Sequence, residues 1–220
     1  MTELQVTLLL AGFRPRPGMT RNPSLEVIEG LKDGWDEEER DMRLEPLVLP
    51  WNYTRATQLV RDALSETRPE LFLLLDVDPT SSDHILQVLA ANWTDDPAPD
   101  QDGAVVHDTI IDREGPVAYR SKLPLDGIWD KLLVERVPCR MGHKAGWGVF
   151  NHVYYQAMRT IAQDDLHTRG GAMQLPPLPG QEEGEETEGR PIERQLDEVD
   201  MVLQTIRHLY ARVEHETADT

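Results

Sequence analysis

The chain has 220 residues, with 22 Lys and Arg against 40 Asp and Glu, a net charge of −18 and a single Cys. This length suits one domain with its own core, and one Cys excludes an intramolecular disulfide framework. Nucleic acid and anionic membranes are excluded as partners because binding either needs a basic patch, and the sequence has no dense Lys/Arg cluster. We therefore expect a single domain over residues 1–220.

The apolar run at residues 6–12 is too short to span a bilayer, which takes about 20 residues, and no Lys or Arg precedes it. We therefore expect a cytoplasmic protein. The run predicts a buried strand. A loop with Pro and Gly then leads to a helix that starts at Pro23 or Ser24, with Asn22 as its N-cap. One side of this helix carries Leu25, Ile28 and Leu31.

Strands and helices alternate through the first third of the chain. Residues 44–49 and 71–75 predict two more strands. Residues 54–67 predict a helix between them, because their apolar residues recur at helical spacing. This alternation is typical of a parallel sheet covered by helices on both faces, which places the chain in the α/β class.

The second half of the chain carries more mixed patterns. Residues 92–103 are loop-like, a helix is predicted from Leu125, a strand over 137–141, a helix over 149–162 and a short last strand at 173–175. Residues 181–190 are acidic and of low complexity, so we expect a flexible surface loop. Residues 191–214 predict an amphipathic helix with a solvated charged face and a buried stripe of Ile192, Leu196, Val199, Leu203, Ile206, Leu209 and Val213.

Several short motifs follow one another in the order found in one enzyme family. They are Leu9 to Phe13, Asn22-Pro23-Ser24, Leu49-Pro50, Pro69-Glu70-Leu71, Ala91-Asn92, Leu123-Pro124, Ala145-Gly146, Asn151 to Tyr155 and Leu175-Pro176. On these motifs the chain resembles pyroglutamyl peptidase I, a cysteine peptidase that removes N-terminal pyroglutamate. The resemblance implies a three-layer α/β/α domain with a twisted, mostly parallel sheet, and an often oligomeric cytosolic enzyme. We expect no cofactor.

The resemblance also implies a catalytic Glu, Cys and His. The family's Glu lies five residues before the Asn that matches Asn92, its Cys directly before the Asn that matches Asn151, and its His before a Val-Pro that matches Leu175-Pro176. A thiolate nucleophile, a base that titrates near neutral pH and a group that orients the base are all required for this chemistry. In this chain the three places hold Gln87, Phe150 and Gln174.

We therefore expect a catalytically inactive homologue that keeps the fold for binding or assembly. Phe150 has no nucleophilic atom, and neither glutamine titrates. We expect the Phe150 side chain to fill the former cleft, because burial of such a side chain is worth about 1.5–3 kcal/mol.

The substrate pocket departs from the family as well. The family's Gly-Gln-Ala-Gly-Gly-Arg loop, which closes on the lactam, is replaced by residues 76–81, which include Val77. Of two aromatic residues that clamp the pyrrolidone ring, Phe13 matches the first, whereas Arg16 stands at the place of the second. Asn22 is retained, either as a helix cap or as a ligand contact.

Three alternatives stay open. A divergent peptidase or amidase would have to use Cys139, the only thiol, although Cys139 and the histidines His143 and His152 are interpreted as packed side chains. A self-assembling homo-oligomer is the second alternative. A peptide or a small molecule is also compatible as a partner.

The third alternative is a ligand- or metal-binding module beyond the end of the third predicted strand, where α/β folds bind ligands. Carboxylates and one imidazole there offer ligands for a divalent ion. The spacing fits no specific metal motif, and we expect this loop to be solvent-exposed and free of metal. The candidate residues are Asp76, Asp78, Asp83 and His84.

Overall fold

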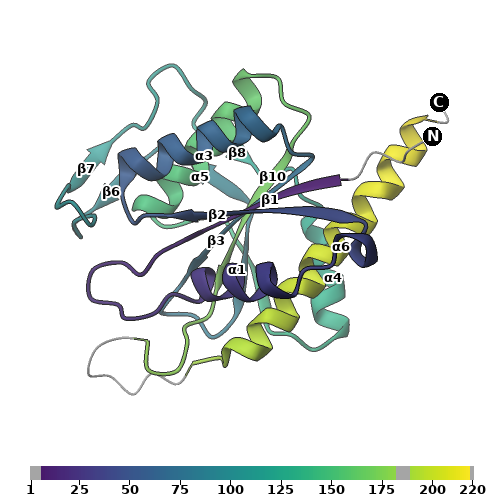
Figure 1. Ribbon diagram of the computed structural model, residues 1–220. Coiled ribbons are helices and arrows are strands. Elements are labelled where there is room, and N and C mark those ends of the chain that lie inside the picture. Colours follow the sequence, from purple (N-terminus) through teal and green to yellow (C-terminus); the bar gives the residue numbers. More distant parts are fainter. Residues whose placement is uncertain (1–5, 182–188, 219–220) are drawn as a thin grey trace.

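A computed structural model describes the backbone of residues 6–181 and 189–218, and the side chains of residues 6–181 and 189–212. A six-stranded sheet runs through the middle of the molecule, and helices cover both of its faces (Figure 1). Helices α3 (Tyr53–Thr67) and α5 (Val149–Gln163) lie on one face. The other face carries α1 (Pro23–Gly34), α4 (Leu125–Val134) and α6 (Ile192–Ala218), and the short α2 (Glu37–Arg40) precedes β2. The predicted α/β class and three-layer architecture are confirmed.

The strands lie in the order β2, β1, β3, β10, β4, β9 across the sheet. All neighbours are parallel except β10 and β4, which are antiparallel. The last strand of the chain therefore lies at the centre of the sheet, where the sequence predicted only three strand residues. The strands are β1 Val6–Phe13, β2 Met42–Leu49, β3 Leu71–Val77, β4 His84–Gln87, β9 Cys139–Gly142 and β10 Arg169–Leu175.

The core consists of two apolar clusters, one on each side of the sheet. Side chains of a strand alternate between its faces. Leu73 thus packs in the cluster beneath α1, α4 and α6, and its neighbours Phe72 and Leu74 pack in the cluster beneath α3 and α5. Every residue of β3 is buried, because a central parallel strand is covered on both faces. This burial explains why the strand reads as an unbroken apolar run.

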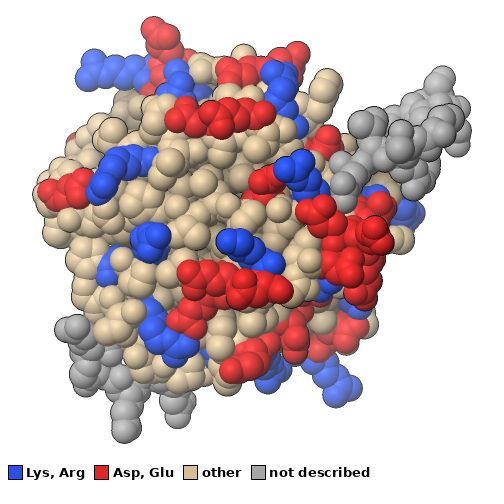
Figure 2. Space-filling view, in the orientation of Figure 1, with Lys and Arg blue, Asp and Glu red and all other residues tan. Residues whose placement is uncertain are grey.

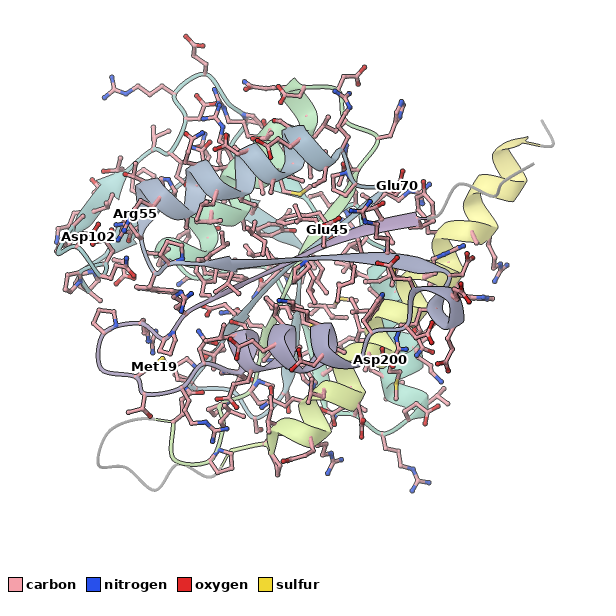
Figure 3. All side chains as sticks on the ribbon, in the orientation of Figure 1. Met19, Glu45, Arg55, Glu70, Asp102 and Asp200 are labelled. Carbon is pink, nitrogen blue, oxygen red and sulfur yellow. The ribbon has the colours of Figure 1, made fainter. Side chains whose placement is uncertain are left out.

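Two short antiparallel pairs lie outside the main sheet. β5 (Leu89–Ala91) pairs with β8 (Ala118–Arg120), and β6 (Thr94–Asp96) pairs with β7 (Val106–Thr109). Residues 92–103 were predicted to be a loop, and strand β6 contradicts that prediction. In the first turn of α3, Arg55 lies beside Asp102 (Figure 3), and their side chains form an ion pair of 2.9 Å that ties α3 to the loop between β6 and β7.

The helix starts agree closely with the sequence patterns. Asn22 caps α1, because its Oδ1 accepts a hydrogen bond of 2.9 Å from the Ser24 amide. On α1 the buried apolar residues are Val27, Ile28 and Leu31, and Leu25 is only partly buried.

None of the described helices is both long and apolar enough to cross a membrane.

Gln181 contradicts the predicted flexible loop at its first residue. It is fully buried, its side-chain Oε1 accepts a hydrogen bond from the Leu178 amide at 3.1 Å, and its carbonyl accepts one from the Thr20 amide at 3.2 Å. These bonds fix the chain directly after β10. Residues 182–188 of the predicted loop lie outside the described residues.

The last helix is amphipathic, as predicted, with Val199, Leu203 and Ile206 buried. The other described residues of the predicted stripe are only partly buried: Ile192, Leu196 and Leu209. The side chain of Val213 lies outside the described ones. Its polar side is not entirely solvated, since Gln195 and Glu198 are buried too. Figure 2 shows acidic and basic side chains interspersed on the face in view, with acidic ones gathered near α2, whose first turn carries three Glu.

Candidate functional site

A pocket of about 330 Å³ lies at the carboxyl ends of β3 and β10 and at the start of α5. Such ends of parallel strands are where α/β folds place ligands. Six of the residues singled out from the sequence line this pocket. They are Arg16, Val77, Phe150 and Gln174, together with Asp76 and Asp78 from the candidate metal group.

Phe150 forms part of an aromatic cluster beside the pocket. It is the second residue of α5 and is 3% exposed, so the burial predicted for it is confirmed. Its ring lies 6.3 Å from the Phe13 ring in an edge-to-face arrangement and 6.4 Å from the Tyr154 ring. Phe13 in turn contacts Trp51 at 5.3 Å. The geometry is that of a packed apolar core.

The two glutamines are hydrogen-bonded to each other. The Gln87 Nε2 donates to Gln174 Oε1 over 2.5 Å, and Gln174 lines the pocket that Phe150 lines. The three positions that the family resemblance assigns to a triad are therefore brought together in space. Gln87 is 1% exposed, and its Oε1 is a buried acceptor without a partner among the described residues.

Asp76 is buried in the pocket wall, at 3% exposure, which contradicts the predicted exposed loop. Its Oδ1 accepts a hydrogen bond of 3.2 Å from the Asn22 side chain. Burial raises the pKa of Asp76 to about 7, although the Asn22 hydrogen bond and the charge of Arg16 act in the opposite direction. Asn22 thus caps α1 and also supports Asp76, and it lies at 1% exposure behind the pocket wall.

His84 lies in a different environment, and its predicted exposure is also wrong. It is fully buried, and its Nε2 lies 2.7 Å from Glu198 Oε2 of α6. Glu198 also pairs with Arg190 at 2.7 Å. Burial lowers the pKa of His84, against the attraction of Glu198. His84 therefore belongs to a polar cluster between the sheet and α6.

The proposed metal group does not come together. Asp76 contacts Asn22, His84 contacts Glu198, and the Asp78 carboxylate accepts hydrogen bonds from the amide and hydroxyl of Thr80. Within residues 6–181 and 189–212 no group of three or more His, Cys, Asp or Glu side chains is arranged to hold a metal ion. The four candidate residues, which include Asp83, lie close together in the sequence but do not converge on one site.

Cys139 lies on the wrong face of the sheet for chemistry at Phe150. It packs against the cluster beneath α1, α4 and α6, whereas Phe150 packs in the cluster beneath α3 and α5. Cys139 is partly buried, and burial, with the negative charge of Asp83, raises the pKa of its thiol. A thiol of raised pKa is a poor nucleophile near neutral pH.

The two histidines that flank Phe150 differ in environment. His143 is exposed, which contradicts its interpretation as a packed side chain. His152 is packed, as interpreted, with its Nδ1 3.2 Å from the Thr94 hydroxyl and its ring 5.3 Å from the Tyr53 ring. Burial lowers the pKa of His152 to about 4, so it is neutral near pH 7.

Four pocket residues were missed in the sequence analysis. Trp51, Asp96, Lys144 and Trp147 all line the pocket. Trp51 directly follows the Leu49-Pro50 motif, and Lys144 and Trp147 flank the Ala145-Gly146 motif, so their proximity to motif residues was the available signal, whereas Asp96 lies outside the motifs. A larger groove of about 530 Å³ runs between α4 and α6, and it shares no residue with the pocket.

The fold and the pocket define a three-layer α/β/α protein with a small pocket at the carboxyl ends of its central strands. The sequence profile described as "Pyroglutamyl peptidase" matches residues 6–209. The chain therefore belongs to the pyroglutamyl peptidase family.

Relatives agree with this assignment. The chain is 30% identical to a pyrrolidone-carboxylate peptidase of Brevibacillus brevis over 91% of its own length and 87% of the relative. It is 31% identical to a pyrrolidone-carboxylate peptidase of Bacillus cytotoxicus over 80% of each chain. A mutant pyrrolidone carboxyl peptidase from Pyrococcus furiosus superimposes with a TM-score of 0.86 at 25% identity, covering 93% of this chain and all of that one.

Proposed function

We propose that the chain is a catalytically inactive member of the pyroglutamyl peptidase family that keeps the fold to bind a ligand. The observation that carries the proposal is Phe150, which stands where the resemblance places the nucleophilic Cys and is packed among aromatic rings. A benzyl side chain can form no acyl intermediate. In triad enzymes, loss of the nucleophile lowers the catalytic rate roughly 10⁶-fold.

The surrounding residues support the same proposal. Gln87 and Gln174 are hydrogen-bonded to each other, and an amide pair neither takes nor returns a proton near neutral pH. Cys139 packs on the other face of the sheet. An oxyanion hole alone would leave a rate enhancement of only about 10³–10⁴-fold over the reaction in water.

The first test is turnover of a pyroglutamyl-linked fluorogenic substrate. The purified chain should release no detectable fluorophore, while a catalytically active family member assayed in parallel releases it. Turnover that persists in Phe150→Ala and disappears in Cys139→Ser would contradict the proposal. Such a result would favour the divergent-peptidase alternative.

The second test restores the three triad residues. The variant carrying Gln87→Glu, Phe150→Cys and Gln174→His should stay inactive, because the family's Gly-Gln-Ala-Gly-Gly-Arg loop is replaced by residues 76–81. Circular dichroism must show that the variant is folded. Robust turnover by this variant would mean that the pocket still accepts pyroglutamyl peptides and that only the chemistry has been lost.

A further inference from the structure

The pocket holds a buried carboxyl group, that of Asp76, which forms no ion pair among the described residues. This carboxyl group accepts hydrogen bonds from two neutral groups, the Asn22 side chain and the Val77 amide. A carboxylate in a buried wall is costly unless a partner compensates its charge. A cation that enters the pocket would therefore stabilise the charged form of Asp76.

The other walls suit a cation with an apolar body. Trp51, Trp147 and Phe150 line the same pocket, and aromatic faces attract ammonium groups. The pocket already shows this contact, because the Lys144 ammonium lies 4.6 Å from the centre of the Trp147 ring. A volume of about 330 Å³ suits a small ligand.

The charged groups around the pocket favour a cation over an anion. Its lining contains three acidic residues, Asp76, Asp78 and Asp96, and two basic ones, Arg16 and Lys144. Lys144 is exposed and Arg16 partly so, whereas Asp76 is buried, and charge interactions are strongest where water is excluded. Asp78 forms an ion pair with Arg140 at 3.8 Å, and Asp96 is only partly buried, so among the described pocket residues Asp76 is the buried acid without an ion pair.

We infer that this pocket binds a small organic ammonium ion, with Asp76 as its counter-ion and the aromatic walls around its apolar part. The inference rests on the proposed loss of catalysis, because it assigns the retained pocket a new ligand class. It concerns binding alone and involves no bond-breaking step.

The test uses three probes that share one ring and differ in charge: benzylamine, benzyl alcohol and benzoate. Isothermal titration calorimetry should show benzylamine binding at least about tenfold more tightly than either other probe. Tighter binding of benzoate, which Arg16 and Lys144 would attract, overturns the inference. So does the absence of measurable heat with benzylamine.

Asp76→Asn provides the decisive variant. Asn is nearly isosteric and keeps an oxygen for the Asn22 amide, so the fold should persist and benzylamine should bind about tenfold more weakly. The matched control is Asp83→Asn, which makes the same charge change in the following loop at a residue that does not line the pocket. Equal affinity in both variants overturns the assignment of Asp76.

The unaltered chain gives a second readout that does not depend on the variant folding. The affinity for benzylamine, which stays protonated in this range, should rise as the pH is raised through about 7 and Asp76 ionises. An affinity that does not change across this range contradicts the inference. These experiments measure binding and not turnover. A failure of the ammonium inference therefore does not decide whether the chain is catalytically inactive, which the fluorogenic assay tests separately.

Discussion

Phe150→Ala is expected to lower the free energy of unfolding by about 3–5 kcal/mol. The side chain is 3% exposed and contacts the rings of Phe13 and Tyr154. Truncation removes these contacts and leaves a cavity that the helix α5 and the sheet are too rigid to close. Urea unfolding followed by circular dichroism measures the change from the shift in the transition midpoint.

Two controls show whether the loss comes from burial at this site. Phe150→Leu keeps most of the volume and should cost much less than Phe150→Ala. Val117→Ala removes an apolar side chain that is 89% exposed, and it should change stability by less than about 0.5 kcal/mol. If Phe150→Ala costs no more than Val117→Ala, Phe150 does not fill the cleft.

Glu198→Gln is expected to lower the free energy of unfolding by about 3 kcal/mol. The Glu198 carboxylate accepts from Arg190 and lies against His84, and its side chain is 5% exposed. An amide at this position leaves the partly buried Arg190 guanidinium without its counter-charge. The neighbouring variant Asp197→Asn, at an exposed position, is the matched control and should change stability by less than about 0.5 kcal/mol.

The pH dependence gives the same residue a second signature. Burial opposes the charge of Glu198, but hydrogen bonds from His84 and Arg190 outweigh it and lower its pKa to about 2, from 4.5. Because the folded pKa is depressed, the contribution of Glu198 is complete above about pH 4.5 and is lost as the pH falls toward about 2. The difference in stability between the unaltered chain and Glu198→Gln should therefore shrink over that window. A constant difference would contradict the assignment.

Much of the fold follows from local patterns. The run at residues 71–75 and the helical spacing of residues 54–67 report burial directly, because elements covered by the sheet and its helices cannot carry polar side chains on their inner faces. Strand β4 escaped prediction because His84 and Gln87 make up half of its residues. Its polar side chains are accommodated by partners in β10 and α6.

The residues of the candidate site were predicted only in part, because local patterns do not show which distant residues cover a polar side chain. The resemblance located Phe150 and Gln174, which do line one pocket. It could not show that Asp76 and His84 are buried, since their partners lie 54 and 114 residues away in the sequence. A polar run between two strands reads as a solvated loop until the residues that cover it are known.

The central position of β10 has a consequence for how the chain is made. β10 pairs with both β3 and β4, yet it is synthesised long after them, and pairings between distant segments form slowly. Until Arg169–Leu175 have left the ribosome, β3 and β4 each present an open strand edge, and such edges promote aggregation. Nascent chains that stop before β10 are therefore expected to become substrates for chaperones and proteases, and the yield of folded protein should depend on how quickly translation covers the stretch between β4 and β10.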